Sequence, residues 1–520
     1  MSDLDTMMQV RAWGEGRAIA TAETLAWPRA SQSSVMILAF VRMAGEATPW
    51  GFAVGAPGQE PQIVSVPDPR DQNATAHLCV ALADALLEHV GHPEFGSAGE
   101  DAARTQLWVP GATHLDALHL LALRYTRARH GTREHITALR RLARAAGFLF
   151  RESRRDGQIR VFDASARLRE TFAFPGESLR QQHLGYLLSW LRPLPVTTTD
   201  ERAHRQNLAE IAERDAVSWT LDPELEEREF EPLLTAMNAA KKAQQPTDEL
   251  DGAIRSVLEP ELARRWKLCE EAWMLLDRDP RPSNRFLEPL EALTREEHQW
   301  QYVRTENKLA TVDESSDDPG VFVIDPETDR SPAAASNRYW STVRSADLAA
   351  ELVHGDRWLL AQLAAEGAAI SGVVRSVRTV KSGRAQEIRW EIVCSSAFAT
   401  KFREGSDLAM HGMPKRTATI VSIEECDGER VIVLEITGWK NERVAERVPA
   451  ASDRVYEGQR VAFVAPTIPD LSRRKAMQSW NADGPGAWLT HSRSKPTPSR
   501  PSANSSGDRN ALLELVQSSR

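Results

Sequence analysis

The spacing of apolar residues changes several times along the N-terminal third of the chain. Short runs rich in strand-forming residues predict four strands, at 34–44, 50–54, 62–66 and 107–109. Apolar residues recur every three or four positions at about 73–90, 113–129 and 133–146, a spacing typical of helices. The order of three strands, a helix, a strand and further helices favours a mixed α/β sheet domain.

A hairpin is predicted directly after the third helix. Gly147 is expected to end that helix, and the apolar runs 148–150 and 158–162 flank the turn residues Asp156 and Gly157. A turn dipeptide between two strand-like runs is a strong hairpin signal. We therefore expect a helix followed by a two-stranded wing.

The pattern is mainly helical from 176 to 310, where apolar residues such as Ile254, Leu258 and Leu262 repeat at helical spacing. This stretch predicts a helical hairpin or small bundle. Residues 311–345 follow as an acidic, Ser-, Pro- and Ala-containing linker.

The apolar spacing changes to two after residue 368. Five strands are predicted, at 370–380, 388–394, 417–423, 431–436 and 461–464. Five short strands predict a small β-barrel of OB-like or SH3-like type. The expected organisation is an α/β domain at 1–175, a helical block at 176–310, a linker at 311–345, a barrel domain at 346–491 and a disordered tail at 492–520.

Charge and cysteine usage narrow the function classes. The 520-residue chain has a net charge of −9, which argues against a protein whose whole surface coats DNA but allows a local basic face. The cysteines lack zinc or disulfide spacing; they are Cys79, Cys269, Cys394 and Cys426. The acidic start is unlike a signal peptide, and no apolar run is long enough to cross a membrane. We expect a cytoplasmic protein without metal, cofactor or membrane partner.

Complete catalytic motifs are missing from the sequence. No run matches the phosphate-binding loop G-x-x-x-x-G-K-[ST], and the glycines at 51–58 do not have dinucleotide-binding spacing. His114 and His119 are five positions apart and do not share a helix face, whereas a helical zinc pair needs a spacing of four. We therefore expect no catalytic residue, and binding as the main activity.

The element order of the first domain resembles that of RNase H-like proteins. Nucleases of this fold hold two metal ions with carboxylates, one of which lies in the first strand. The run 35–44 contains no Asp or Glu, so we expect a degenerate, structural version. An atypical metal-dependent nuclease is an alternative, with its candidate acids elsewhere in the chain: Asp68, Asp84, Asp116 and Asp163.

Arginines are concentrated between residues 124 and 160. The candidate nucleic-acid-binding residues there are Arg133, Arg140, Arg141, Arg144, Arg151, Arg154 and Arg155. Guanidinium groups along a helix and a wing can follow a phosphate backbone. The alternative is a solvated face whose arginines pair with acids near 224–229 and 268–278.

The predicted barrel offers a second candidate surface. Its candidate binding residues are Arg375, Arg378, Lys381 and Arg384, with further basic residues at Arg389, Lys415 and Arg416. Small barrels bind single strands through basic side chains and aromatic stacking. Trp390 and Trp439 could supply such stacking, but the favoured interpretation places both tryptophans in the core.

The barrel region also resembles part of a known family. Its residues Ile370–Val374, Arg389–Ile392, Gly412–Pro414, Thr437–Lys440 and Gly484–His491 are similar to the barrel before the motor of superfamily 1 helicases related to the nonsense-mediated-decay helicase. Bacterial helicases of this kind are often fused to RecB-like and RNase H-like nuclease domains. The order of domains here is similar to such a fusion, but the motor motifs and nuclease acids are absent. The resemblance implies a separate P-loop helicase or ATPase as partner, in DNA repair or defence against phage.

Three hypotheses follow from the sequence. The first is a non-catalytic subunit that binds DNA or RNA beside a separate helicase. The second is a protein-interaction scaffold that binds no nucleic acid. The third is the atypical metal-dependent nuclease.

Overall fold

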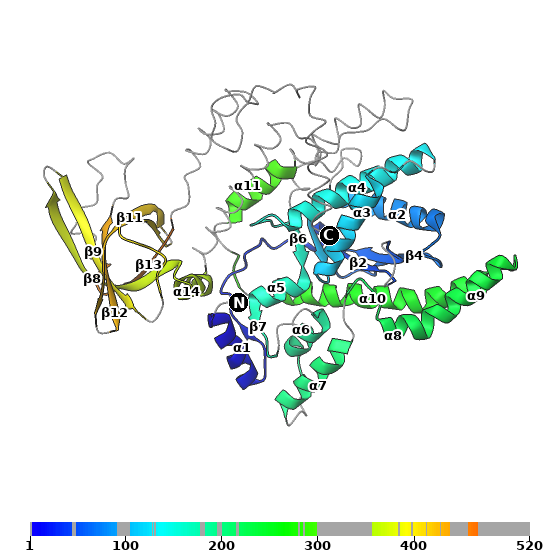
Figure 1. Ribbon diagram of the computed structural model, residues 1–520, viewed down its shortest axis with the longest axis horizontal. Helices are drawn as coiled ribbons and strands as arrows, with labels where there is room; N and C mark the ends of the chain where they lie inside the picture. Colours follow the sequence, from blue (N-terminus) through cyan, green and yellow to red (C-terminus); the bar gives the residue numbers. More distant parts are fainter. Residues whose placement is uncertain are drawn as a thin grey trace, which may run out of the picture. The chain divides into compact units, whose positions relative to one another are not determined.

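The structure is a computed structural model (Figure 1). It describes residues 3–43, 48–90, 105–126, 128, 132–176, 183–194, 200–214, 218–278, 281–283, 287–298, 356–382, 385–396, 399–411, 413–426, 428–436 and 456–465. The predicted linker, the predicted tail, Trp439 and the similar stretches Thr437–Lys440 and Gly484–His491 lie outside the described residues. None of the described helices has the length and apolar character that crossing a membrane requires.

A five-stranded mixed sheet forms the centre of the N-terminal region, with strand order β4-β3-β2-β5-β6. Its strands are β2 (Val35–Val41), β3 (Gly51–Gly55), β4 (Gln62–Ser65), β5 (Gln106–Val109) and β6 (Val161–Asp163). The first three strands pair antiparallel, while β5 and β6 run parallel to β2. All seven residues of β2 are buried, as a central strand covered on both faces requires. The predicted α/β sheet and its first four strands are thus confirmed.

Helices cover both faces of this sheet (Figure 1). In that view α2 (Gln72–Val90), α3 (Ala112–Tyr125) and α4 (Arg133–Ser153) lie above the strands, and α10 (Asp248–Arg278) runs below them. The indole of Trp266 on α10 donates to the backbone oxygen of Ile37 at 3.1 Å, which fixes this helix to the central strand. Burial of apolar side chains on both faces stabilises the sheet.

The predicted hairpin after α4 is wrong. The helix does not end at Gly147 but continues to Ser153, and the following strand β6 pairs parallel with β5. Phe148 and Leu149 are buried, and they extend the helical spacing of Leu142 and Ala145 by one more turn. Packing of these apolar residues outweighs the small helix penalty of Gly147, so the structure has no wing here among its described residues.

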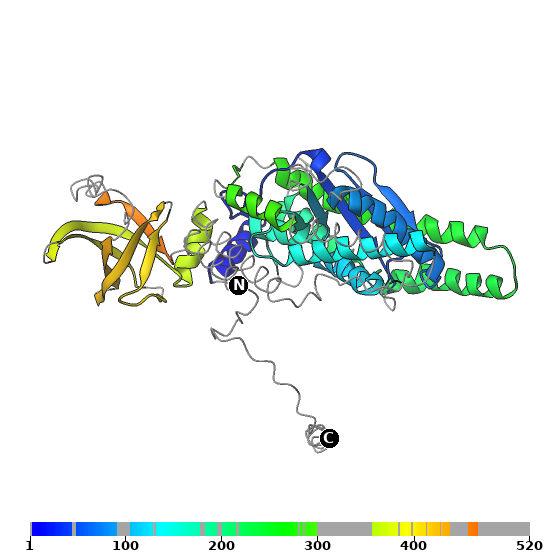
Figure 2. The same cartoon turned by 90° about the horizontal axis from the view of Figure 1, so that it is seen from above.

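The middle helices share the core of the sheet. They include α6 (Leu184–Leu191), α7 (Glu201–Arg214), α8 (Pro223–Leu225), a π-helical turn (Glu226–Phe230), α9 (Glu231–Lys242) and α11 (Leu287–Glu297). One continuous cluster of buried side chains extends from Leu25 through the sheet to Leu290. In both views α9 lies beside the first turns of α10 (Figures 1 and 2). The helical stretch therefore shares its core with the sheet.

Shorter elements connect the N-terminal segment to the domain. Helix α1 (Asp3–Glu15) precedes β1 (Ile19–Ala20), which pairs antiparallel with β7 (Phe172–Ala173) after α5 (Ala164–Thr171). The buried carboxylate of Asp356 accepts hydrogen bonds from the backbone N–H groups of Glu23 and Thr24, at 2.8 and 3.0 Å. The same side chain caps α14 (Arg357–Ala365), the helix that leads into the barrel.

The predicted C-terminal β-barrel is confirmed, and it is closed. Its order is β10-β11-β12-β9-β8-β13, with every neighbouring pair antiparallel. The strands are β8 (Ala369–Ser382), β9 (Ala385–Ser395), β10 (Asp407–Met410), β11 (Met413–Cys426), β12 (Glu429–Ile436) and β13 (Arg460–Val464). The prediction of five strands missed β10, which is only four residues long. The barrel is therefore larger than a five-stranded OB-fold.

Candidate nucleic-acid interface

One side of α4 carries a row of arginines. Positions 133, 140, 144 and 151 fall on one helix face, at successive spacings of seven, four and seven. Residues on the other sides, including Leu139, Leu142 and Leu149, are buried. Arg140, Arg144 and Arg151 are half-buried. We call Arg140, Arg144, Arg151 and the neighbouring Arg154 the arginine face.

Two of the other predicted α4 residues lie at the edges of this face. Helix α4 begins at Arg133 after the cap Thr132, whose side chain accepts from the backbone N–H of His135 at 3.3 Å. The side chain of Arg133 is outside the described part of the chain. Arg141 is half-buried on the flank of the helix.

The arginine face adjoins α3 along a seam between the two helices. Arg140 Nε donates to the backbone oxygen of Ala128 at 3.0 Å, just beyond the end of α3. At the other end, the imidazole of His119 stacks on Phe150 with ring centroids 4.4 Å apart. The guanidinium of Arg154 lies 5.2 Å from the centroid of the Phe150 ring and 3.7 Å from the carboxylate of Asp116.

Arg155, which the sequence analysis included among the binding residues, lies in a buried ion pair. Its side chain is only 8% exposed and forms a 2.9 Å ion pair with Glu152, which is 5% exposed. Arg155 also contacts the hydroxyl of Thr294 on α11. A guanidinium held this way stabilises the contact between two helices and does not present its charge to a ligand.

Acidic neighbours surround the described barrel arginines. Arg375 forms ion pairs with Glu391 at 3.3 Å and Glu429 at 3.2 Å. Arg378 is 73% exposed and lies 3.6 Å from Glu391. The side chain of Lys381 and all of Arg384 are outside the described residues. Carboxylates this close reduce the positive potential around Arg375 and Arg378, as Asp116 does around Arg154.

The interpretation of Trp390 as a core residue is confirmed. The side chain is fully buried in the barrel, 4.9 Å from the Tyr456 ring and 6.2 Å from the Phe463 ring. The guanidinium of Arg416, itself buried, lies 4.9 Å from the same indole. Neither residue is available to stack on a base.

The four acids named for a nuclease lie on separate elements. Asp68 pairs with Lys241 of α9 at 2.8 Å, Asp84 is exposed on α2, and Asp116 faces Arg154. Asp163 ends β6 and caps α5 by accepting from the backbone N–H of Ala166. Across the described residues, no group of three or more His, Cys, Asp or Glu side chains is arranged to hold a metal ion.

Two of these acids, Asp68 and Asp163, have shifted pKa values. Burial alone would raise the pKa of Asp68, but hydrogen bonds from Lys241 and from the backbone of Arg70 outweigh it and lower the pKa. Burial raises the pKa of Asp163, against the cap hydrogen bond from Ala166. Burial also raises the pKa of the free Cys79 thiol to about 11, so this thiol is unreactive at neutral pH.

The carboxyl end of β2 is filled by protein groups. The buried His114 accepts a hydrogen bond through Nδ1 from the backbone N–H of Phe40 at 3.1 Å. The segment at Trp219 lies alongside Arg42, whose guanidinium is 4.4 Å from the indole centroid. The buried Arg265 holds this segment by donating to Ser218 O. Residue spacing gave no signal for these contacts, because they join segments far apart in the sequence.

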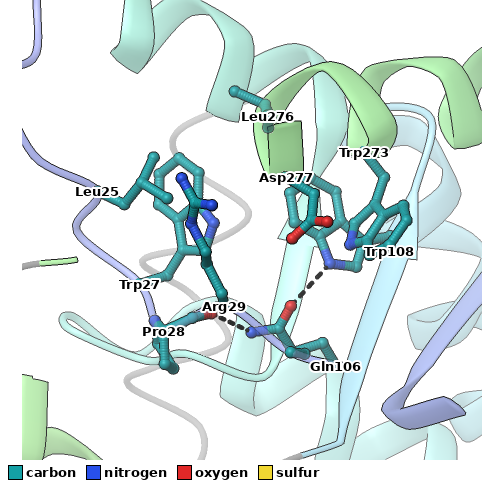
Figure 3. Close-up of a pocket in the computed structure, with 10 residues that line it drawn as sticks. Leu25, Trp27, Pro28, Arg29, Gln106, Trp108, Trp273, Leu276 and Asp277 are labelled. Atoms are coloured by element: carbon teal, nitrogen blue, oxygen red, sulfur yellow. Dashed lines mark hydrogen bonds between the residues drawn. The ribbon is translucent and has the colours of Figure 1, made fainter. Parts of the chain in front are cut away.

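A small pocket lies between the N-terminal segment, β5 and the end of α10 (Figure 3). It is lined by Leu25, Trp27, Pro28, Arg29, Ala30, Gln106, Trp108, Trp273, Leu276 and Asp277. Gln106 donates to Pro28 O at 2.8 Å and accepts from the Trp108 indole at 3.1 Å. The amide therefore ties the segment to the sheet, and the remaining space holds about one water molecule.

No protein-family model matches the chain, and no curated protein or solved structure matches it significantly. The arginine face therefore has to be interpreted from its own chemistry.

Proposed function

We propose that this protein is a non-catalytic nucleic-acid-binding subunit that grips DNA or RNA through the arginine face of α4. The observation that carries this proposal is the composition of the helix. Residues 132–156 contain seven arginines and three acids, in a chain whose net charge is −9. Apolar residues cover the other sides of α4, and Arg140, Arg144 and Arg151 lie half-buried along the remaining side. Arginine binds phosphate oxygens in a bidentate geometry.

The fold supports a structural role for the α/β domain. Three antiparallel strands followed by two parallel ones, with helices on both faces, support a degenerate RNase H-like domain. Its first strand carries no acid, and Phe40 near the end of that strand is bound by His114. On this proposal the domain presents α4 rather than a metal site.

A separate P-loop helicase or ATPase is the proposed partner. The sequence contains no phosphate-binding loop, while its barrel region resembles the barrel that precedes a superfamily 1 motor. The closed barrel supports a docking role, since its described arginines lie close to acids and its tryptophan is internal. DNA repair or defence against phage would use such a division of labour.

The direct test is fluorescence anisotropy with labelled single- and double-stranded DNA and RNA, across a salt series with magnesium present. We expect salt-sensitive binding without cleavage, because counterion release drives phosphate contacts. The double variant Arg140→Glu/Arg144→Glu should lose at least tenfold in affinity, because each substitution removes about one phosphate contact.

The matched control is Arg228→Glu/Arg255→Glu, which changes the net charge equally at two exposed sites away from α4. Affinity of this control should stay close to that of the parent chain. Absence of binding at low salt, or an equal loss in both variants, would contradict the proposal. Magnesium-dependent cleavage would support the nuclease alternative instead.

A further inference from the structure

Apolar and aromatic groups line the α3 side of the arginine face. Leu123 on α3 is 61% exposed. His119, one helical turn before it, stacks on Phe150 of α4, and both rings are half-buried. The result is a row of apolar surface beside a row of guanidinium groups.

These two rows match the two chemical parts of an unpaired strand. Single-stranded nucleic acid presents phosphates on one side and base faces on the other, and its binding sites combine basic grooves with stacking or apolar platforms. A duplex keeps its base faces stacked inside, so that an apolar row next to the phosphate contacts would gain little from it. An apolar row therefore discriminates between the two forms where a purely basic helix would not.

The length of the arginine face limits the size of the ligand. From Arg140 to Arg154 the helix rises by about 21 Å, at about 1.5 Å per residue. A stacked strand rises about 3.4 Å per nucleotide, so this face spans on the order of six nucleotides.

We propose that the ligand of this surface is single-stranded nucleic acid, with its phosphates on the arginine face and its bases against Leu123 and the His119–Phe150 pair. This inference rests on the proposed function and adds to it the strandedness and the site size. Arg154 joins the two rows, because its guanidinium lies over Phe150 at the end of the seam.

The first experiment compares a labelled 12-nucleotide single strand with its own duplex, using the full-length protein. The single strand should bind at least tenfold more tightly. Leu123→Ala should weaken single-strand binding by about tenfold and leave duplex binding unchanged, since base stacking and apolar contacts are lost. Met7→Ala removes another exposed apolar side chain, 66% exposed on α1, and should change neither affinity.

The second experiment needs no variant and titrates single strands of increasing length. Affinity should rise steeply up to about six nucleotides and then level off. Preference for the duplex, or an equal loss of both affinities in Leu123→Ala, would overturn the assignment of single strands while leaving nucleic-acid binding intact. A protein that binds neither form would overturn this inference and the proposed function together.

Discussion

The arginines of α4 and those of the barrel show how differently one residue type can be used. Residues 132–156 carry seven arginines and three acids, whereas residues 369–436 carry ten basic and nine acidic side chains. In the barrel, Arg375 and Arg378 share Glu391, and Arg430 pairs with Glu425. A locally neutral surface has little attraction for a polyanion, while a stripe of like charges has much. Under the proposed function, this difference favours α4 over the barrel as the phosphate site.

The largest change in stability is expected in the barrel, where Trp390 lies in the core. Trp390→Ala should destabilise the barrel by about 3–5 kcal/mol, because a fully buried indole leaves a cavity. Thermal denaturation and denaturant titration measure the change. Trp390→Phe should retain the fold and the parent affinity for nucleic acid. A specific loss of affinity in this milder variant would mean that the indole contacts the ligand.

The next effect distinguishes the buried Arg155, which follows the end of α4, from the arginine face. Arg155→Ala should lower the free energy of unfolding by about 3 kcal/mol, since it leaves the buried carboxylate of Glu152 without its partner. Urea denaturation followed by circular dichroism measures this. Affinity for nucleic acid, measured where the variant is fully folded, should stay within about twofold of the parent, against the tenfold losses expected on the arginine face. The opposite pattern would place Arg155 in the interface.

A smaller effect is expected for an acidic residue, Asp163. Asp163→Ala should cost about 1 kcal/mol through loss of the α5 cap, whereas Asp163→Asn keeps an acceptor for the Ala166 N–H. Because burial raises the pKa of Asp163, the protonated acid fits the fold better than the carboxylate. Its stabilising contribution is complete below the ordinary pKa of the acid and is lost as the pH rises through the raised value.

The free energy of unfolding, measured against pH for the parent and both Asp163 variants, tests the direction of this pH dependence. The parent should lose stability relative to Asp163→Asn as the pH rises through that range. A parent that instead gains stability over Asp163→Asn would show that a positive charge pairs with the carboxylate.

The smallest stability effect is expected for the exposed arginine of the face. Arg154→Ala should change the free energy of unfolding by less than about 1 kcal/mol, because its pair with Asp116 is 3.7 Å long and more than half exposed. Its effect on binding should exceed its effect on stability. Denaturation and anisotropy measured on the same preparation decide this, and a large loss of stability with parent-like affinity would remove Arg154 from the interface.

Local patterns predicted the elements better than their contacts. The alternation in Ile388–Cys394 identified β9, and the helical spacing of the apolar residues from 133 onward identified the start of α4. The same approach ended α4 at Gly147, because the tertiary packing of Phe148 and Leu149 is invisible in local sequence.

The candidate site could be predicted in part. A cluster of arginines is visible in the sequence, but which guanidinium groups face water depends on helix phase and on neighbours such as Glu152 and Thr294. The seam with α3 was not predictable, since it joins His119 and Phe150 across thirty-one positions of sequence.

The salt dependence of binding tests the central claim most directly. Affinity falls as salt rises, so the slope of log affinity against log salt is negative. In Arg140→Gln/Arg144→Gln this slope should become shallower by about 2, which is about 1 for each phosphate contact removed. The barrel pair Arg375→Gln/Arg378→Gln should leave the slope of the parent chain unchanged. A slope reduced by the barrel pair and unchanged by the α4 pair would contradict the account and move the phosphate site to the barrel.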